Sequence, residues 1–213
     1  MDDLVEKALA RWPNVPAIAG WLKLDCAGNW LLTGPVPQGL TISNPRILNF
    51  IARNYGCEAD GRYYFQNGPQ KAYVHLEYTP WVYRLHPLEN GDLMLTTHTG
   101  LLDWPEALFQ DEQGRVLVQA HMGIGLLHSH DMELFAVGLQ ESSEGLVHHA
   151  VWAVPDTDPD SLVSARTRLR REKHTPVGSR EMELKVQNIE SARVAENFRF
   201  NPEPTVNLPD TSQ

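Results

Sequence analysis

Turns that pair an acidic or amide residue with a nearby glycine recur along this sequence, and each precedes a short apolar or aromatic run. They occupy residues 25–29, 59–62, 89–92 and 111–114. Aspartate or asparagine in a turn accepts hydrogen bonds from the backbone ahead of it, and glycine takes the positive φ that closes the bend. Such turns typically join antiparallel strands. The pattern therefore predicts a chain built largely from hairpins.

Apolar residues with a period of two supply the strands. Residues 71–78 alternate most clearly, and residues 81–85, 93–97 and 115–120 continue the series. Residues 19–24 and 30–33 flank the first turn and predict a hairpin. The turns share no longer repeated pattern, so an antiparallel meander is favoured over a propeller or solenoid.

Two helices are predicted in the first third of the chain. Residues 4–12 place their apolar side chains on one face after Asp2 or Asp3. Ser43 or Asn44 is a typical N-cap, with Pro45 at the first helical position. The second helix is expected to bury Ile47, Leu48, Ile51 and Tyr55 and to end at Gly56.

Residues 129–139 fit either a helix or a strand. Asp131 and Glu133 after Ser129 suit the first turn of a helix, whereas the apolar residues 134–137 suit a strand as well. We favour the helix, and we expect residues 146–154 to be extended.

These elements predict an α+β protein: an antiparallel meander sheet with two or three packed helices and an extended C-terminal tail. Composition changes after Pro155, where three aspartates and further prolines precede a basic segment at residues 166–173. We therefore expect a single α+β domain over residues 1–155 and a partly docked C-terminal extension over residues 156–213.

Charge and composition exclude several classes of protein. The formal net charge of −9 disfavours generic binding to nucleic-acid phosphates. The basic segment is either a local patch for an anionic partner or a solvated surface. No apolar run approaches the ~18 residues of a membrane span, and the acidic start does not resemble a secretory signal. Cys26 and Cys57 lack a metal or redox spacing. We expect a soluble cytoplasmic protein that does not bind membranes.

The densest cluster of possible metal ligands consists of His121, His128, His130 and Asp131. An H-x-H pair on a strand places both imidazoles on one face, where they can share a metal ion, and an aspartate can add an oxygen. The cluster therefore defines a hypothetical divalent-metal site. Ordinary surface or cap histidines are the favoured interpretation, because a chance pair two residues apart is unsurprising among nine histidines.

Aromatic residues crowd the first 83 positions and suggest a binding surface. Tryptophan and tyrosine dominate binding hot spots because they bury a large rigid area and carry a polar group. The polar turn at residues 66–70 lies among them, and its amides suit ligand recognition. The candidate ligand-binding residues are Trp21, Tyr64, Gln66, Asn67, Gln70 and Trp81. Ordinary core packing is the competing interpretation.

Short runs of aromatic and turn residues resemble an uncharacterised proteobacterial family that is known only as a domain of unknown function. They are residues 12–16, 20–22, 50–55, 64–70, 80–82 and 125–128, and the resemblance spans residues ~10–150. It implies no activity, cofactor or catalytic residue. No nucleophile elbow or phosphate-binding loop appears either.

Two hypotheses follow. The first is a non-catalytic cytosolic binding or regulatory module that contacts a protein or small-molecule ligand through its aromatic sheet surface. The alternative is a metal-dependent hydrolase that uses the cluster of residues 121–133.

Overall fold

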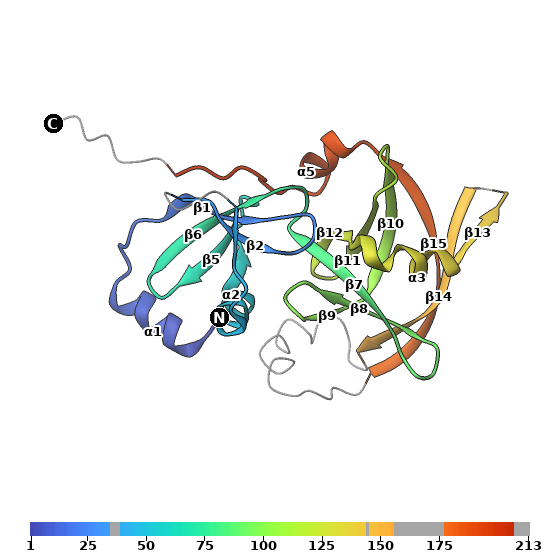
Figure 1. The fold of residues 1–213 in the computed structure, drawn as a ribbon, viewed down its shortest axis with the longest axis horizontal. Helices are drawn as coiled ribbons and strands as arrows, with labels where there is room; N and C mark the ends of the chain where they lie inside the picture. Colours follow the sequence, from blue (N-terminus) through green and yellow to red (C-terminus); the bar gives the residue numbers. More distant parts are fainter. Residues whose placement is uncertain (35–38, 144, 156–176, 207–213) are drawn as a thin grey trace. The chain divides into compact units, whose positions relative to one another are not determined.

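The computed structural model of the chain describes residues 1–34, 39–143, 145–155 and 177–206. Contacts divide the chain into two compact units (Figure 1). Unit 1 comprises Met1–Pro80 and Ala192–Gln213, and unit 2 comprises Trp81–Ser191. Residues 156–176, which include the basic segment, lie outside the described residues. The predicted domain boundary after residue 155 adjoins them and stays a prediction.

Unit 1 is built on a mixed sheet of six strands within the described ranges. Their order is β3-β2-β1-β6-β5-β4. The bounds are β1 Ile18–Leu24, β2 Trp30–Leu32, β3 Leu40–Thr41, β4 Tyr55–Cys57, β5 Tyr63–Asn67 and β6 Gln70–Leu76. Each half of the sheet is an antiparallel set of three strands, and a parallel pairing of β1 with β6 joins the halves.

Helix α2 (Pro45–Asn54) connects the two halves and packs on the sheet. Asn44 caps it, as predicted, because its side chain accepts a hydrogen bond from the backbone N–H of Arg46. Ile51 is buried, but the helix ends at Asn54, so Gly56 is not its cap and Tyr55 starts β4. The N-terminal helix α1 (Asp3–Arg11) is present as predicted.

Strand β1 carries a bulge at Gly20. Ile18 pairs with Ala72 and Leu22 with Val74, so four residues of β1 oppose two of β6. Gly20 adopts φ +79°, a conformation that glycine reaches without strain. The ring of Trp21 lies against Gly34, where a Cβ atom would be 2.2 Å from the ring. The bulge therefore sets the position of Trp21, which is 44% exposed.

Unit 2 contains a closed mixed barrel of seven strands within the described part of the chain. Around the barrel the order is β7-β8-β14-β15-β10-β11-β12, and β12 pairs back to β7. The bounds are β7 Trp81–Pro87, β8 Leu93–Thr97, β10 Pro105–Asp111, β11 Val116–Ala120, β12 Gly123–Leu127, β14 Gly145–Pro155 and β15 Val177–Ile189. Strands β9 (Leu102–Asp103) and β13 (Leu139–Ser142) pair with β8 and β14.

The predicted fold class is therefore wrong. The antiparallel hairpins exist, but parallel pairings of β7 with β12, β8 with β14 and β10 with β15 close them into a barrel instead of an open meander. Pairings between strands far apart in sequence leave no mark in turn chemistry or local periodicity. Short-range patterns indicated the hairpins and missed the closure.

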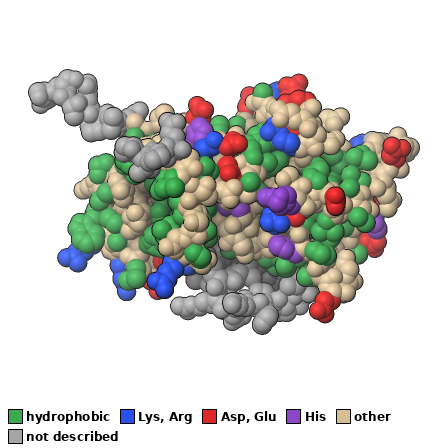
Figure 2. Space-filling view, viewed as in Figure 1, with side chains coloured by type: hydrophobic (Ala, Val, Ile, Leu, Met, Phe, Trp, Pro, Cys, Tyr) green, Lys and Arg blue, Asp and Glu red, His purple; other side chains and the backbone are tan. Residues whose placement is uncertain are grey.

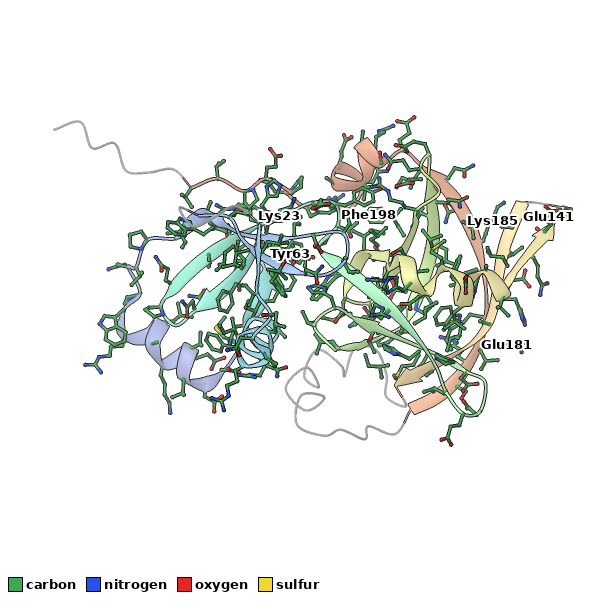
Figure 3. The ribbon with its side chains drawn as sticks, in the orientation of Figure 1. Lys23, Tyr63, Glu141, Glu181, Lys185 and Phe198 are labelled. Carbon is green, nitrogen blue, oxygen red and sulfur yellow. The ribbon has the colours of Figure 1, made fainter. Side chains whose placement is uncertain are left out.

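Strand β15 lies in the part of the chain that was predicted to be an extended tail, and the structure places it in the barrel instead. It pairs with β14 over nine residues and with β10 over four. Its outward side chains, among them Glu181 and Lys185 in Figure 3, are exposed, whereas Met182 and Leu184 are half-buried. That alternation has the period of a half-buried strand.

Two 3-10 turns and two short helices complete the described chain. A 3-10 turn (Ser129–Asp131) leads into helix α3 (Met132–Val137), which confirms the helix favoured there. A second 3-10 turn (Ser191–Arg193) leads into α5 (Val194–Asn197). In unit 1, the N–H of Asn201 then donates to the carbonyl of Gly61 at 2.9 Å. No helix in the described ranges has the length and apolar character needed to cross a bilayer.

Candidate ligand-binding cavity

A cavity of about 570 Å³ opens between helix α2 and the face of the unit 1 sheet that the helix covers. Cross-strand neighbours supply its floor: Leu22 pairs with Leu32, and Ile18 with Ala72. Ile51 of α2 closes it from the other side. The full lining is Ile18, Trp21, Leu22, Leu32, Leu40, Thr41, Ile42, Ser43, Asn44, Ile47, Ile51, Phe65, Asn67, Gln70 and Ala72.

Three large apolar side chains at this cavity are exposed. Trp21 is 44%, Leu40 53% and Ile47 46% accessible to solvent. They come from β1, β3 and α2. Figure 2 shows apolar side chains reaching the surface of unit 1. Large exposed apolar groups that converge on one concavity mark a binding site more often than a structural surface.

The polar members of the lining are all uncharged. They are two hydroxyls, from Thr41 and Ser43, and three amides, from Asn44, Asn67 and Gln70. Asn67 and Gln70 face each other at the end of the hairpin of β5 and β6, where Gly68 takes φ +57°. Within the described residues no hydrogen bond engages their side-chain amides.

The N-terminus of α2 lies at the same rim, and its backbone donors are largely used. Pro45 has no N–H, and the N–H of Arg46 donates to Asn44 Oδ1 at 2.9 Å. The N–H of Leu48 donates to the carbonyl of Asn44 at 3.0 Å. The rim therefore offers a ligand side-chain amides and hydroxyls more than free helix donors.

Three of the six predicted ligand-binding residues meet at this cavity: Trp21, Asn67 and Gln70. Gln66 is buried and donates to the carbonyl of Gly68 at 3.0 Å, which holds the hairpin turn. Trp81 is buried in unit 2.

Tyr64 belongs to a separate cluster around Glu58. Lys71 lies over the Tyr64 ring at 4.6 Å and also bonds to Glu58. Burial by itself would raise the pKa of Glu58, but hydrogen bonds from Lys71 and Tyr73 lower it below its usual range. Burial and the bond to Glu58 raise the pKa of Tyr73 to about 12. These groups satisfy one another and hold β5 to β6.

The predicted metal ligands do not converge. His121 stacks on Trp104 with ring centroids 4.8 Å apart. His128 accepts a hydrogen bond from the backbone of His130, and the two rings meet edge to face. Among the residues that the structure describes, no group of three or more His, Cys, Asp or Glu side chains is arranged to hold a metal ion. The geometry gives the metal hypothesis no support.

Asp131 forms an ion pair with Arg84 instead of contributing to a metal site. Its carboxylate accepts from Arg84 Nε at 2.7 Å, from Arg84 Nη2 at 3.2 Å and from the N–H of Leu85 at 3.0 Å. Burial opposes ionisation, but these hydrogen bonds hold the pKa of Asp131 below its ordinary value. The residue ties the start of α3 to β7.

Sequence reasoning missed most of the apolar lining, including Leu40 and Ile47. Leu40 lies in a stretch that reads as a loop, and Ile47 was expected in the core. The available signal was the amphipathic helix itself, whose apolar face spans both Ile47 and Ile51. Periodicity shows which face is apolar and not whether a partner covers it.

Comparison with known proteins gives a family but no activity. A family model described as "Protein of unknown function (DUF2946)" matches residues 1–205. None of the curated proteins compared with the sequence matches it.

Two solved structures of DUF1285 family proteins are similar. The protein from Silicibacter pomeroyi DSS-3 is 17% identical, with a TM-score of 0.44 over 67% of this chain and 87% of its own. The protein from Shewanella baltica OS155 is 16% identical, with a TM-score of 0.38 over 55% and 91%. Likeness at this level says nothing about function.

Proposed function

The chain belongs to the family of unknown function whose model matches residues 1–205, and we propose from its geometry that it is a binding module for a small apolar molecule. The ligand occupies the cavity between α2 and the unit 1 sheet. Trp21, Leu40 and Ile47 form its entrance.

The observation that carries this proposal is the convergence of exposed apolar side chains on an apolar concavity. Ligand sites are typically clefts of about 300–1,000 Å³ lined by apolar and aromatic groups with a few polar ones. A cavity of about 570 Å³ with ten apolar and five uncharged polar lining residues fits that description. Leaving Leu40 and Ile47 in water has a cost that a ligand would remove.

A small molecule suits this concave shape better than a protein partner, whose interface needs a broader surface. We propose a cytoplasmic location from the charge and the cysteine content of the sequence. Nucleic acid and membranes are not among the partners proposed.

The test is a titration with Nile red, an uncharged apolar dye that fluoresces on entering a dry site. We expect saturable binding with one site per chain. Trp21→Ala removes an entrance residue and should weaken binding about tenfold, since a buried aromatic contact is worth more than 1 kcal/mol. Trp12→Ala is the matched control, because Trp12 is 49% exposed and does not line the cavity.

A second variant fills the cavity instead of opening it. Ala72 lies on the floor, so Ala72→Phe places a ring inside the site. If the dye binds Ala72→Phe and Trp21→Ala as well as it binds the wild type, while circular dichroism shows all three folded, the dye is bound elsewhere and the proposal fails.

A further inference from the structure

We propose that the natural ligand carries an uncharged hydrogen-bonding group, such as a hydroxyl, carbonyl or amide, which lies between Asn67 and Gln70. A ligand with a carboxylate or ammonium group is discriminated against. The inference rests on the proposed function, because it assigns chemistry to the ligand of the same cavity.

The first argument is the absence of compensating charge. Among the described residues that line the cavity, none is Asp, Glu, Lys, Arg or His. An ion that enters an apolar site loses hydration, and it is stabilised only by an opposite charge or several hydrogen bonds. Arg46 lies two residues after Asn44 but is not a lining residue. A charged head group would therefore have to stay in solvent.

The second argument concerns the N-terminus of α2, an element at the rim whose dipole attracts anions. Its first-turn donors are reduced by Pro45, and Asn44 Oδ1 already accepts from the N–H of Arg46. An anion here would compete with the N-cap that holds the helix start. Pro45 and the N-cap thus remove two of the backbone donors that an anion at this helix end would use.

The third argument is the pair of amides opposite. Asn67 and Gln70 are cross-strand partners, so their side chains share the end of the β5–β6 hairpin. Each amide offers a carbonyl acceptor and an NH₂ donor. A neutral group that both donates and accepts, such as a hydroxyl, matches this pair. A carboxylate accepts only, so it could use the two NH₂ groups but would leave both amide carbonyls without a donor.

The experiment compares three ligands with the same ring system: naphthalene, 2-naphthol and 2-naphthoate at pH 7. Calorimetry and displacement of Nile red give their affinities. We expect 2-naphthol to bind about tenfold tighter than 2-naphthoate because of the cost of desolvating the carboxylate. We expect it to bind about fivefold tighter than naphthalene because of the hydrogen bonds to the amides.

The double variant Asn67→Leu, Gln70→Leu identifies the contact. It should lower 2-naphthol affinity about fivefold, to the level of naphthalene, while naphthalene binding stays unchanged and serves as the internal control. The comparison of ligands on the wild type needs no variant, so it stands even if the double variant does not fold.

The possible failures are distinct. If 2-naphthoate binds as tightly as 2-naphthol, or if naphthalene and 2-naphthol bind alike, the neutral polar end is wrong and the apolar cavity remains a binding site. If none of the three ligands and no Nile red binds, the proposed function itself is overturned.

Discussion

The hydroxyl of Tyr83 lies 2.9 Å from Oδ2 of Asp103, and both side chains are fully buried in unit 2. The same hydroxyl lies 2.9 Å from the carbonyl oxygen of Gly123. A hydroxyl has one hydrogen, so it serves the carboxylate when Asp103 is ionised and the carbonyl when Asp103 is protonated and donates its own proton to Tyr83. The arrangement accommodates both protonation states.

Burial raises the pKa of Asp103 to about 6, although hydrogen bonds from Tyr83 and from the backbone N–H groups of Trp104 and Met122 act to lower it. The folded-state pKa is thus above the unfolded value of 3.8. The associated stabilisation is present in full below pH 3.8 and is lost as the pH rises through about 6.

We predict that the wild type loses stability relative to Asp103→Asn between pH 4 and pH 8, by on the order of 3 kcal/mol. Asparagine does not titrate, so the substitution changes the free energy of unfolding by an amount that does not depend on pH at this position. The pH dependence of the difference between the two proteins therefore reports the ionisation of Asp103. Urea unfolding of both proteins at several pH values measures it. A difference that stays flat across this range contradicts the raised pKa.

His148 shifts stability in the opposite direction. Its ring is buried and stacks on Phe135 with centroids 4.3 Å apart. Burial lowers the pKa of His148 below its ordinary 6.5. A base with a lowered folded pKa stabilises the fold above pH 6.5, and that stabilisation is lost as the pH falls below this value.

We therefore predict that the wild type loses stability when the pH falls from 7 to 5 and that His148→Phe, which keeps a stacked ring, loses less. His130→Phe is the control because His130 is exposed. Urea unfolding at the two pH values gives the comparison. An unchanged acid dependence in His148→Phe would show that another group causes the loss.

The sequence predicted local structure well, as the first and last turns show. The N–H of Gly28 donates to the carbonyl of Asp25 at 3.1 Å, and that of Gly114 donates to the carbonyl of Asp111 at 2.9 Å. Both glycines have positive φ. Turn chemistry involves residues two or three positions apart, so it is visible in the sequence. One of the two partners of β15 is β10, where Leu108 pairs with Val186 across 78 residues of sequence, and nothing local specifies that pairing.

The candidate site was predicted only in part for the same reason. Trp21 and the hairpin amides stand out by residue type, whereas Leu22 and Ile51 look like any core residues. Gln66 and Gln70 have the same side chain and lie in the same hairpin, yet one is buried in a turn contact and the other lines the cavity. Strand register decides which face each occupies.

The ion pair of Arg84 and Asp131 supplies a further prediction. Asp131→Asn should destabilise the protein by about 2 kcal/mol, because it removes a charged acceptor that is 7% exposed and leaves Arg84 without its bidentate partner. Glu133→Gln, at an exposed position in the first turn of α3, should change stability by less than about 0.5 kcal/mol. Thermal unfolding compares them, and equal effects would mean that the pair is dispensable.

The N-cap of α2 gives the last prediction and connects stability to the cavity rim. Asn44→Ala should lower the free energy of unfolding by about 1 kcal/mol, since the N–H of Arg46 loses its acceptor. Asn49→Ala, in the exposed middle of the same helix, should instead raise it by a few tenths of a kcal/mol through helix propensity.

Because uncapping frees a backbone donor at the rim, Asn44→Ala should also reduce the preference for 2-naphthol over 2-naphthoate, whereas Asn49→Ala should not. Unfolding in urea and the ligand titrations measure the two effects on the same samples. A stable Asn44→Ala protein with unchanged ligand preference would show that the helix end takes no part in excluding anions.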